Sequence, residues 1–188
     1  RRRRHPASVH WEGQMLPVEV AFISYDPRAQ MAIVFLREST GAAAPEDGED
    51  TPAEESRLLP IWIGLPEASA IYTRLEGREA ERPMTHDLLV STIDTLGASV
   101  KSIMVHALEE WVFHGRIVLD VDGRELDLDS RPSDAIALAL RADAPIFVAN
   151  DVMEGSAISE SDIRGIDASM ESLKDALESL DDDSYVKV

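Results

Sequence analysis

Apolar side chains stand at every second position along three stretches in the first third of the chain, and this period of two is typical of β-strands. The stretches are residues 16–25, 31–37 and 58–63. Asp26-Pro27-Arg28-Ala29 lies between the first two and has the composition of a tight turn. We therefore expect an antiparallel hairpin, followed by a third strand that ends at Gly64.

Apolar side chains then recur at spacings of three and four, as they do along one face of a helix. The first such stretch begins at Pro66 and ends at Gly77, with Glu67 in its first turn. The second is expected to have Thr85 as its cap and Gly97 as its end. Its apolar stripe is formed by Leu88, Leu89, Thr92, Ile93 and Leu96.

Alternation returns in residues 100–108 and 111–121, which we expect to form a long hairpin connected at Glu109-Glu110. Asp122-Gly123 is a strong two-residue turn into residues 124–129, so the three stretches predict a meander. The packed face of its second strand is predicted to carry Trp111, Phe113, Ile117, Leu119 and Val121.

The rest of the chain is organised around the stretch that follows this meander. Pro132 suits the first turn of a helix, and residues 135–140 have no polar face. The pattern therefore predicts a helix that is buried on most sides, followed by a short strand at 145–149. Taken together, the elements predict a single α+β domain over residues 15–155, with a mostly antiparallel twisted sheet of six to seven strands packed by three helices.

Three flanking or inserted segments differ from this pattern. Residues 1–14 resemble a disordered lead-in, and residues 39–56 form an acidic low-complexity loop. Residues 156–188 form an acidic tail with an amphipathic helix that begins near Asp167. The helix would either dock on its own domain or make a helix–helix contact in a homo-oligomer, with a dimer favoured. Its seam is heptad-like and consists of Ile163, Ile166, Met170, Leu173, Leu177 and Leu180.

Composition narrows the class of protein. The chain has 188 residues and no cysteine, which excludes disulfides and thiolate metal sites. Of the net charge of −18, a net −14 lies in residues 39–56 and 151–188, and no basic stripe argues for high-affinity nucleic-acid binding. No apolar run approaches the ~20 residues of a membrane helix, and the four initial arginines lack the apolar segment of a secretory signal. We expect a cytoplasmic protein with no membrane partner.

Four motifs carry a family resemblance. They are Leu59-Pro60-Ile61-Trp62-Ile63-Gly64, Glu67-Ala68, Thr85-His86-Asp87-Leu88-Leu89, and Arg131-Pro132-Ser133-Asp134-Ala135-Ile136-Ala137-Leu138-Ala139. In this order, over about residues 15–155, they resemble the bifunctional nuclease (BFN) domain family. The resemblance implies a compact α+β domain with combined RNase and DNase activity. Two features depart from the family pattern: the insertion at 39–56, and Trp111-Val112-Phe113 in place of a more usual glycine-containing turn.

Polar residues gather at the three predicted helix starts, where backbone N–H groups and the helix dipole attract anions. If these starts converge, Arg131 would grip a phosphate, with Arg82, Thr85 and Ser133 as further contacts. His86 would act as general acid or base. The predicted catalytic set is therefore His86, Asp87 and Asp134.

Carboxylates at the same helix starts suggest a metal. Glu67, Asp87 and Asp134 would hold Mg²⁺ or Mn²⁺ for metal-assisted hydrolysis of RNA or DNA, and no organic cofactor is expected. A simpler interpretation makes these residues good helix starters, with Arg131–Asp134 or Arg82–Asp87 as ordinary ion pairs. The alternative function is then a non-catalytic module that binds a small anion and self-associates.

Two weaker candidates remain. One face of the strand at 124–129 carries Glu125, Asp127 and Asp129, which would be either metal ligands or, more often, a solvated face. His106 and His114 lie on neighbouring predicted strands but lack a third ligand. The sequence has no nucleotide-binding P-loop, no G-x-S-x-G elbow and no zinc motif.

Overall fold

The computed structural model describes residues 13–39, 57–78, 80–163 and 172–178, and its centre is a mixed sheet of eight strands. The strand order is β6-β5-β4-β7-β1-β2-β3-β8, and β4–β7 is the one parallel pair among the described strands. The α+β class and the mostly antiparallel sheet are confirmed, but the expected number of six to seven strands is too small. The strands are β1 (Met15–Asp26), β2 (Met31–Glu38), β3 (Arg57–Ile63), β4 (Ala98–Glu109), β5 (Val112–Val121), β6 (Arg124–Ser130), β7 (Ile146–Ala149) and β8 (Ile158–Ser159).

Strand β7 joins the two halves of the sheet. It pairs antiparallel with β1 and parallel with β4, so among the described strands it is β7 that links the β1–β2–β3 half of the sheet to the β4–β5–β6 meander. Ile146, Val148 and Ala149 of this strand are buried. The additional strand, β8, has two residues and pairs with Arg57 and Leu58, and an element this short has no periodic pattern to detect.

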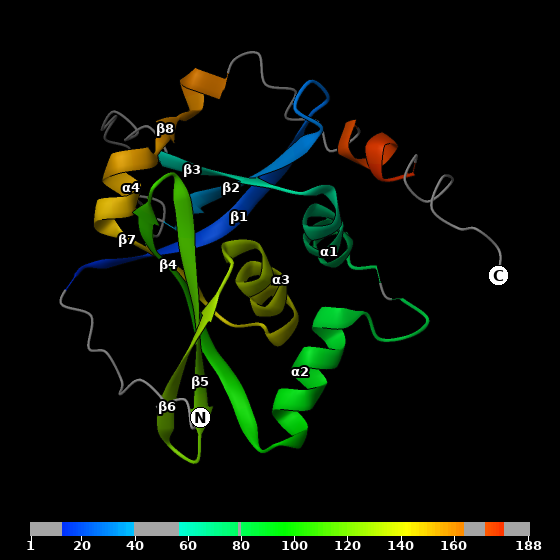
Figure 1. The fold of residues 1–188 in the computed structure, drawn as a ribbon, viewed down its shortest axis with the longest axis vertical. Helices are drawn as coiled ribbons and strands as arrows, with labels where there is room; N and C mark the ends of the chain where they lie inside the picture. Colours follow the sequence, from blue (N-terminus) through cyan, green and yellow to red (C-terminus); the bar gives the residue numbers. More distant parts are fainter. Residues whose placement is uncertain (1–12, 40–56, 79, 164–171, 179–188) are drawn as a thin grey trace, which may run out of the picture.

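Three helices were expected and are present: α1 (Leu65–Leu75), α2 (Thr85–Thr95) and α3 (Pro132–Ala142). Helix α3 packs on β4 and β5 and contacts both α1 and α2, as Figure 1 shows. A fourth helix, α4 (Asn150–Ser156), and a 3₁₀ helix, η1 (Glu160–Ile163), follow β7 and were not expected. The predicted domain end at residue 155 falls within α4.

The prediction of a buried central helix is confirmed. Helix α3 begins with Pro132 and ends at Asp143, whose φ of 52° is left-handed and stops the helix. Between them, Ile136 and Leu138 are fully buried, and each stabilises the fold by roughly 1.5–3 kcal/mol on area bookkeeping. Because α3 is held on several sides, the position of its N-terminus is fixed.

Helix α2 differs from expectation in its cap and in its apolar stripe. Thr85 is the first helical residue rather than the cap, and the Asp87 carboxylate instead accepts a hydrogen bond from the Met84 backbone N–H at 2.8 Å. Of the predicted stripe only Ile93 is buried, while Leu88 and Leu96 are 60% and 76% exposed. The spacing found the helix but could not show how much of its apolar face the domain covers.

The position of Trp111 was predicted incorrectly. Glu109 pairs with Val112, so the β4–β5 turn consists of Glu110 and Trp111 rather than Glu109-Glu110. Trp111 therefore lies outside β5 and is 93% exposed instead of packed. The predicted strand began one residue too early, because a tryptophan at this position has the apolar side chain expected of the first packed residue.

Part of the predicted tail seam lies in the core. Residues 172–178 are helical, Leu173 is fully buried, and Leu177 packs against the same main core. Ile166, Met170 and Leu180 lie outside the described residues, as do residues 1–12 of the expected lead-in and residues 40–56 of the expected loop. Within the described part of the chain, no helix is both long enough and apolar enough to cross a membrane.

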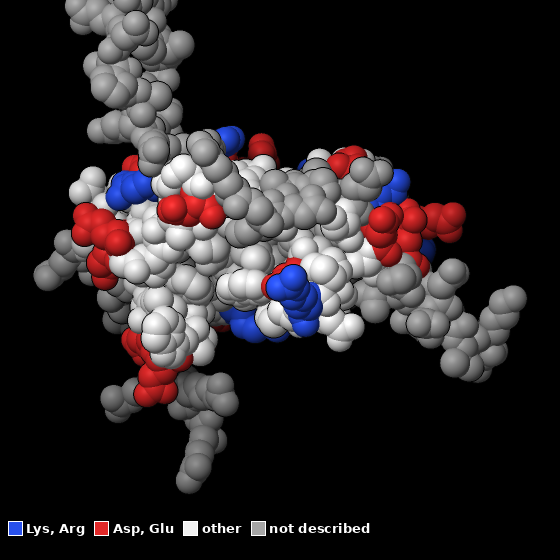
Figure 2. Space-filling view, turned by 90° about the horizontal axis from the view of Figure 1, so that it is seen from above, with Lys and Arg blue, Asp and Glu red and all other residues white. Residues whose placement is uncertain are grey.

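Surface charge is divided into separate groups. Figure 2 shows acidic side chains gathered at several places on one face, with isolated basic side chains between them. No continuous basic area is visible there among the described residues.

Candidate functional site

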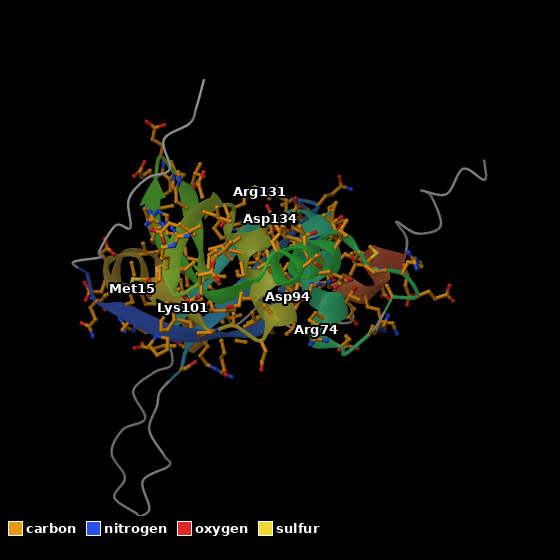
Figure 3. The ribbon with its side chains drawn as sticks, turned by 90° about the horizontal axis from the view of Figure 1, so that it is seen from below. Met15, Arg74, Asp94, Lys101, Arg131 and Asp134 are labelled. Atoms are coloured by element: carbon orange, nitrogen blue, oxygen red, sulfur yellow. The ribbon has the colours of Figure 1, made fainter. Side chains whose placement is uncertain are left out.

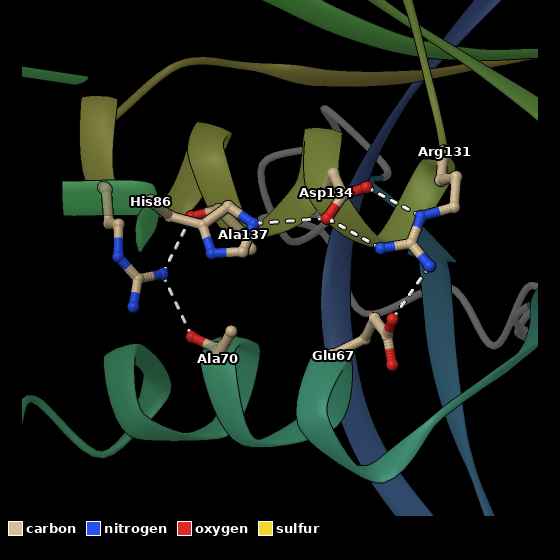
Figure 4. Close-up of polar contacts among 7 residues, drawn as sticks. Glu67, Ala70, His86, Arg131, Asp134 and Ala137 are labelled. Atoms are coloured by element: carbon tan, nitrogen blue, oxygen red, sulfur yellow. Dashed lines mark hydrogen bonds and ion pairs between the residues drawn. The ribbon is translucent and has the colours of Figure 1, made fainter. Parts of the chain in front are cut away.

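Four of the predicted site residues form one chain of contacts across the starts of α1, α2 and α3. Figure 3 shows Arg131 and Asp134 side by side, away from Arg74 and Asp94 near the ends of α1 and α2. Arg131 donates to both Asp134 oxygens, from Nε at 2.8 Å and from Nη2 at 3.2 Å, and from Nη1 to Glu67 Oε1 at 2.8 Å. His86 Nε2 lies 3.4 Å from Asp134 Oδ1 (Figure 4). The three helix starts therefore converge, which was the condition for a shared site.

Glycine in β5 allows the start of α3 to lie close to the sheet. Gly115 pairs with Ser130, the last residue of β6. A Cβ atom on Gly115 would lie 2.9 Å from both the Pro132 nitrogen and the Ser130 carbonyl oxygen, which are backbone atoms that cannot move aside. Arg131 lies between these two contacts, so the backbone that carries its side chain is fixed by β5.

A second glycine gives room to Glu67. Gly64 stands in the N-cap position of α1, before Pro66 in the first turn. A Cβ atom on Gly64 would collide with Oε2 of Glu67, so the carboxylate folds back over the helix start in space that only glycine leaves open. The Glu67 side chain is mostly buried in this position and directs Oε1 to Arg131.

Electrostatics keep the central pair ionised. Partial burial alone would raise the pKa of Asp134, but hydrogen bonds and charge from Arg131, with a smaller effect of His86, lower that pKa below its usual value. Hydrogen bonds to Asp134 and Glu67 raise the pKa of Arg131 above its already high value. Asp134 is therefore a carboxylate and Arg131 a cation throughout the physiological range.

Asp87 lies outside this chain of contacts. Its Oδ1 accepts a hydrogen bond from Arg141 Nε at 2.5 Å, and its Oδ2 accepts the one from Met84 described above. Arg141 also donates to the carbonyl oxygens of Ala70 at 3.0 Å and Ala137 at 2.9 Å. Burial would raise the pKa of Asp87, but the bonds from Met84 and Arg141 lower it. The structure thus uses Asp87 to fix the start of α2 against α1 and α3.

The chain of contacts borders a pocket of about 410 Å³ between the three helices. Glu67, Thr85, His86, Arg131 and Asp134 line it, together with Arg141. Ser133 is buried in the first turn of α3 and lines a neighbouring pocket instead.

Arg82 is exposed, and it lines neither of these two pockets. Among the described residues Asp87 pairs with Arg141, not with Arg82 as the simpler interpretation supposed.

The predicted metal ligands do not form a cation site as they are placed. The Arg131 guanidinium lies between Glu67 and Asp134 and bonds both, which is where a shared cation would have to be. Asp87 is engaged by Arg141. Among the described residues, no group of three or more histidine and carboxylate side chains is arranged to hold a metal. A divalent ion would require these side chains to rearrange.

The two weaker candidates have ordinary surroundings. On β6, Glu125 forms an ion pair with Lys101, and Asp127 forms one with Arg116 at 3.1 Å. The rings of His106 and His114 are 6.3 Å apart and edge to face, which is a packing contact.

Arg141 is the residue of this region that the sequence analysis missed. It lies two turns after Asp134 on α3, with Ala137 between them, so the three share one face of the helix. A single arginine at the end of an otherwise apolar buried helix must find an acceptor, and this was the available signal. The side chain is 7% exposed.

Comparisons with known proteins agree with the predicted resemblance. Residues 51–161 match the model of the bifunctional nuclease domain family. An uncharacterized protein of Mycobacterium tuberculosis is 33% identical over 175 residues, covering 89% of this chain and 96% of that protein. Bifunctional nuclease 1 of Oryza sativa subsp. japonica is 27% identical over 106 residues, covering 55% of this chain but 30% of the plant protein.

Proposed function

The chain belongs to the bifunctional nuclease domain family, and on that premise we propose that it hydrolyses phosphodiester bonds of RNA or DNA. The observation that carries the proposal is the Glu67–Arg131–Asp134–His86 chain of contacts, which borders a pocket at the starts of three helices. A cation, an ionised carboxylate and an imidazole are together the groups that hydrolysis of a phosphodiester requires.

Arg131 is proposed to bind the scissile phosphate. The described residues accept three of its five N–H groups, and its side chain is 65% exposed. Two N–H groups therefore remain for phosphate oxygens. Glu67 and Asp134 orient the guanidinium plane, which makes the contact directional as well as charged.

His86 is proposed to move the proton. Its Nε2 faces the Asp134 carboxylate, which would stabilise an imidazolium and leave Nδ1 toward the reaction. Nδ1 would take a proton from the attacking water as the new P–O bond forms. It would return that proton to the leaving oxygen as the old P–O bond breaks, so the products are a phosphomonoester and an alcohol.

The use of Mg²⁺ or Mn²⁺ stays a prediction. Glu67 and Asp134 are the carboxylates nearest the proposed phosphate position, but both are now bonded to Arg131. When bound, a divalent ion would neutralise charge on the phosphate.

Cleavage of labelled single-stranded RNA and DNA, with Mg²⁺, with Mn²⁺ and with EDTA, tests the proposal. We expect His86→Ala and Asp134→Asn to lower the rate by about 10²-fold or more, in the range of a lost general acid–base group. Glu125→Gln is the matched control, because Glu125 is a carboxylate in an ion pair on β6, away from the pocket. Equal rates in wild type and both site variants would show that a contaminant cleaves the substrate and that the assignment is wrong.

A separate observation favours the alternative function, a module that assembles with itself. Helix α2 and its two cap residues expose Met84, Leu88, Leu89 and Leu96, although an apolar stripe on a helix is normally covered. Part of the tail seam is used within the chain itself, since Leu173 is buried in its own core. If the protein forms a homodimer, α2 is therefore a better candidate for the interface than the tail.

A further inference from the structure

A second pocket lies next to the pocket described above, and aromatic side chains line part of it. Its volume is about 420 Å³, and it shares Glu67 and Arg131 with the first pocket. Its other side is apolar and aromatic, with Trp62, Trp111 and Phe113 among the lining residues. Trp62 is 50% exposed and Trp111 almost completely so, which leaves large aromatic surfaces beside a cation.

Trp111 occupies a backbone position that disfavours it. Glu110 and Trp111 have φ values of 48° and 68°, both in the left-handed region. Two-residue hairpin turns with positive φ at both positions favour Asn-Gly or Asp-Gly, and a bulky residue there is strained. The β5–β6 turn of the same meander has the favoured pair, Asp122-Gly123.

Burial does not compensate this strain within the part of the chain that the structure describes. A tryptophan at a left-handed position could be retained for its burial, but the Trp111 side chain is exposed. What the position does provide is an indole group at the mouth of the pocket that contains Arg131. Strain of this kind is typical of sites where a side chain serves a ligand.

We propose that this pocket binds an unpaired nucleobase, which stacks on Trp111 and Trp62 while Arg131 contacts the adjacent phosphate. The proposal rests on the proposed function, because it assumes that the ligand is a nucleic acid. It adds that Trp111 and Trp62 are the residues that select a single strand. A base inside a duplex has both faces covered by its neighbours, so only a single-stranded or displaced base can stack on an exposed indole.

The charges near the pocket sharpen the proposal. Glu67 lines the pocket, Glu110 precedes Trp111, and Arg131 is the cation among the lining residues. One phosphate contact predicts a weak salt dependence, with a slope of log affinity against log salt of about −0.7 for a single strand. Binding would then come mainly from stacking, in contrast to a groove lined by lysine and arginine.

Fluorescence anisotropy of a labelled single-stranded oligonucleotide, with the whole chain in EDTA so that metal-dependent cleavage is prevented, tests this inference. We expect Trp111→Gly to weaken binding about tenfold, as the loss of one stacked base predicts. The same variant should melt at the same temperature as wild type or higher, because glycine suits the left-handed position. Loss of binding with retained stability separates a ligand contact from a folding defect.

Asp122→Gly is the matched control, since it also places glycine at a left-handed turn position, where φ is 54°, but at the other end of β5. Its affinity should equal that of wild type. Trp62→Leu, which keeps an apolar side chain on β3, should weaken binding in the same direction as Trp111→Gly. An oligonucleotide with abasic sites should bind wild type as weakly as the intact oligonucleotide binds Trp111→Gly, and combining both changes should add little.

The inference is overturned if wild type binds no single strand, binds duplex equally well, or binds the abasic and intact strands alike. It is also overturned if Trp111→Gly changes the sedimentation of the protein instead of its affinity, since the pocket would then be a contact between copies. Cleavage of a single strand with unchanged affinity in Trp111→Gly would reject the stacking site and leave the nuclease proposal intact. Tryptophan-dependent binding without cleavage would support the stacking site and reject the nuclease proposal.

Discussion

Arg141 at the end of α3 holds Asp87 at the start of α2, with Nε and Oδ1 2.5 Å apart. The guanidinium also reaches the Ala70 carbonyl of α1, so one side chain connects all three helices that surround the pocket. Because His86 is the neighbour of Asp87 in sequence, this contact sets where the imidazole lies relative to Asp134. The catalytic proposal therefore depends on Arg141, which lines the same pocket but is not one of the proposed catalytic groups.

We predict that Arg141→Met destabilises the protein by about 2–3 kcal/mol, since it leaves a partly buried carboxylate and two carbonyl groups without a charged donor. Urea denaturation measures the change. Asp94→Ala, on the exposed last turn of α2, is the control and should change stability by no more than about 0.5 kcal/mol. An equally small effect of Arg141→Met would contradict the structural role.

The Asp134 carboxylate should make stability depend on pH. Its folded pKa is lower than its unfolded value of about 4, so ionised Asp134 stabilises the fold above that pH, and this contribution is lost as the pH falls through the folded pKa. Arg131→Gln should thus be less stable than wild type by up to about 1 kcal/mol at pH 7, and the difference should shrink between pH 5 and pH 3.

Denaturation at several pH values measures this difference. In a background with both Asp134→Asn and Glu67→Gln, which removes both carboxylates that Arg131 bonds, replacement of Arg131 should give a difference that no longer varies with pH. A difference that stays constant in the single variant down to pH 3 would show that Arg131 does not stabilise the ionised carboxylate.

Gly115 should tolerate no side chain. We predict that Gly115→Ala destabilises the protein by about 1–3 kcal/mol, because the new methyl group would overlap backbone atoms of Ser130 and Pro132. It should also lower catalytic activity, since Arg131 lies between these residues. Gly155→Ala, within α4 and with open space around the new Cβ atom, should be neutral or stabilising. Equal melting temperatures of the two variants would rule out the close approach.

The exposed face of α2 should mediate self-association. We predict that wild type sediments as a dimer and that Leu96→Glu sediments as a monomer, because a charge would have to be desolvated at the interface. Asp94→Lys, a charge change at an exposed position on the opposite side of the same helix, should leave the dimer intact. Analytical ultracentrifugation measures both variants, and a monomeric wild type would rule out the association.

The fold was largely predictable from local patterns. Each predicted stretch of alternation or helical spacing that falls on described residues became a strand or helix, because period two and period 3.6 directly reflect which side chains are buried. The missed elements lack such a pattern. Strand β8 has two residues, and α4 has seven with only Val152 and Met153 buried.

The site was only partly predictable, for a different reason. Helix-start chemistry identified Glu67, His86, Arg131 and Asp134, since capping and anion binding are local properties of a helix end. The partners of these residues depend on how helices pack. Asp87 has the same local signature as Asp134, and only tertiary contact with Arg141 assigns it a structural part.

The central position of β7 has a consequence for how the chain reaches its native state. Residues 146–149 are made after both halves of the sheet, yet each half has an unpaired edge until they arrive. During synthesis on the ribosome, the β1–β2–β3 half and the β4–β5–β6 meander therefore cannot join into one sheet until β7 is made. A chain released before Ile146 is made would have two unpaired strand edges. Such a chain is bound by chaperones and aggregates readily.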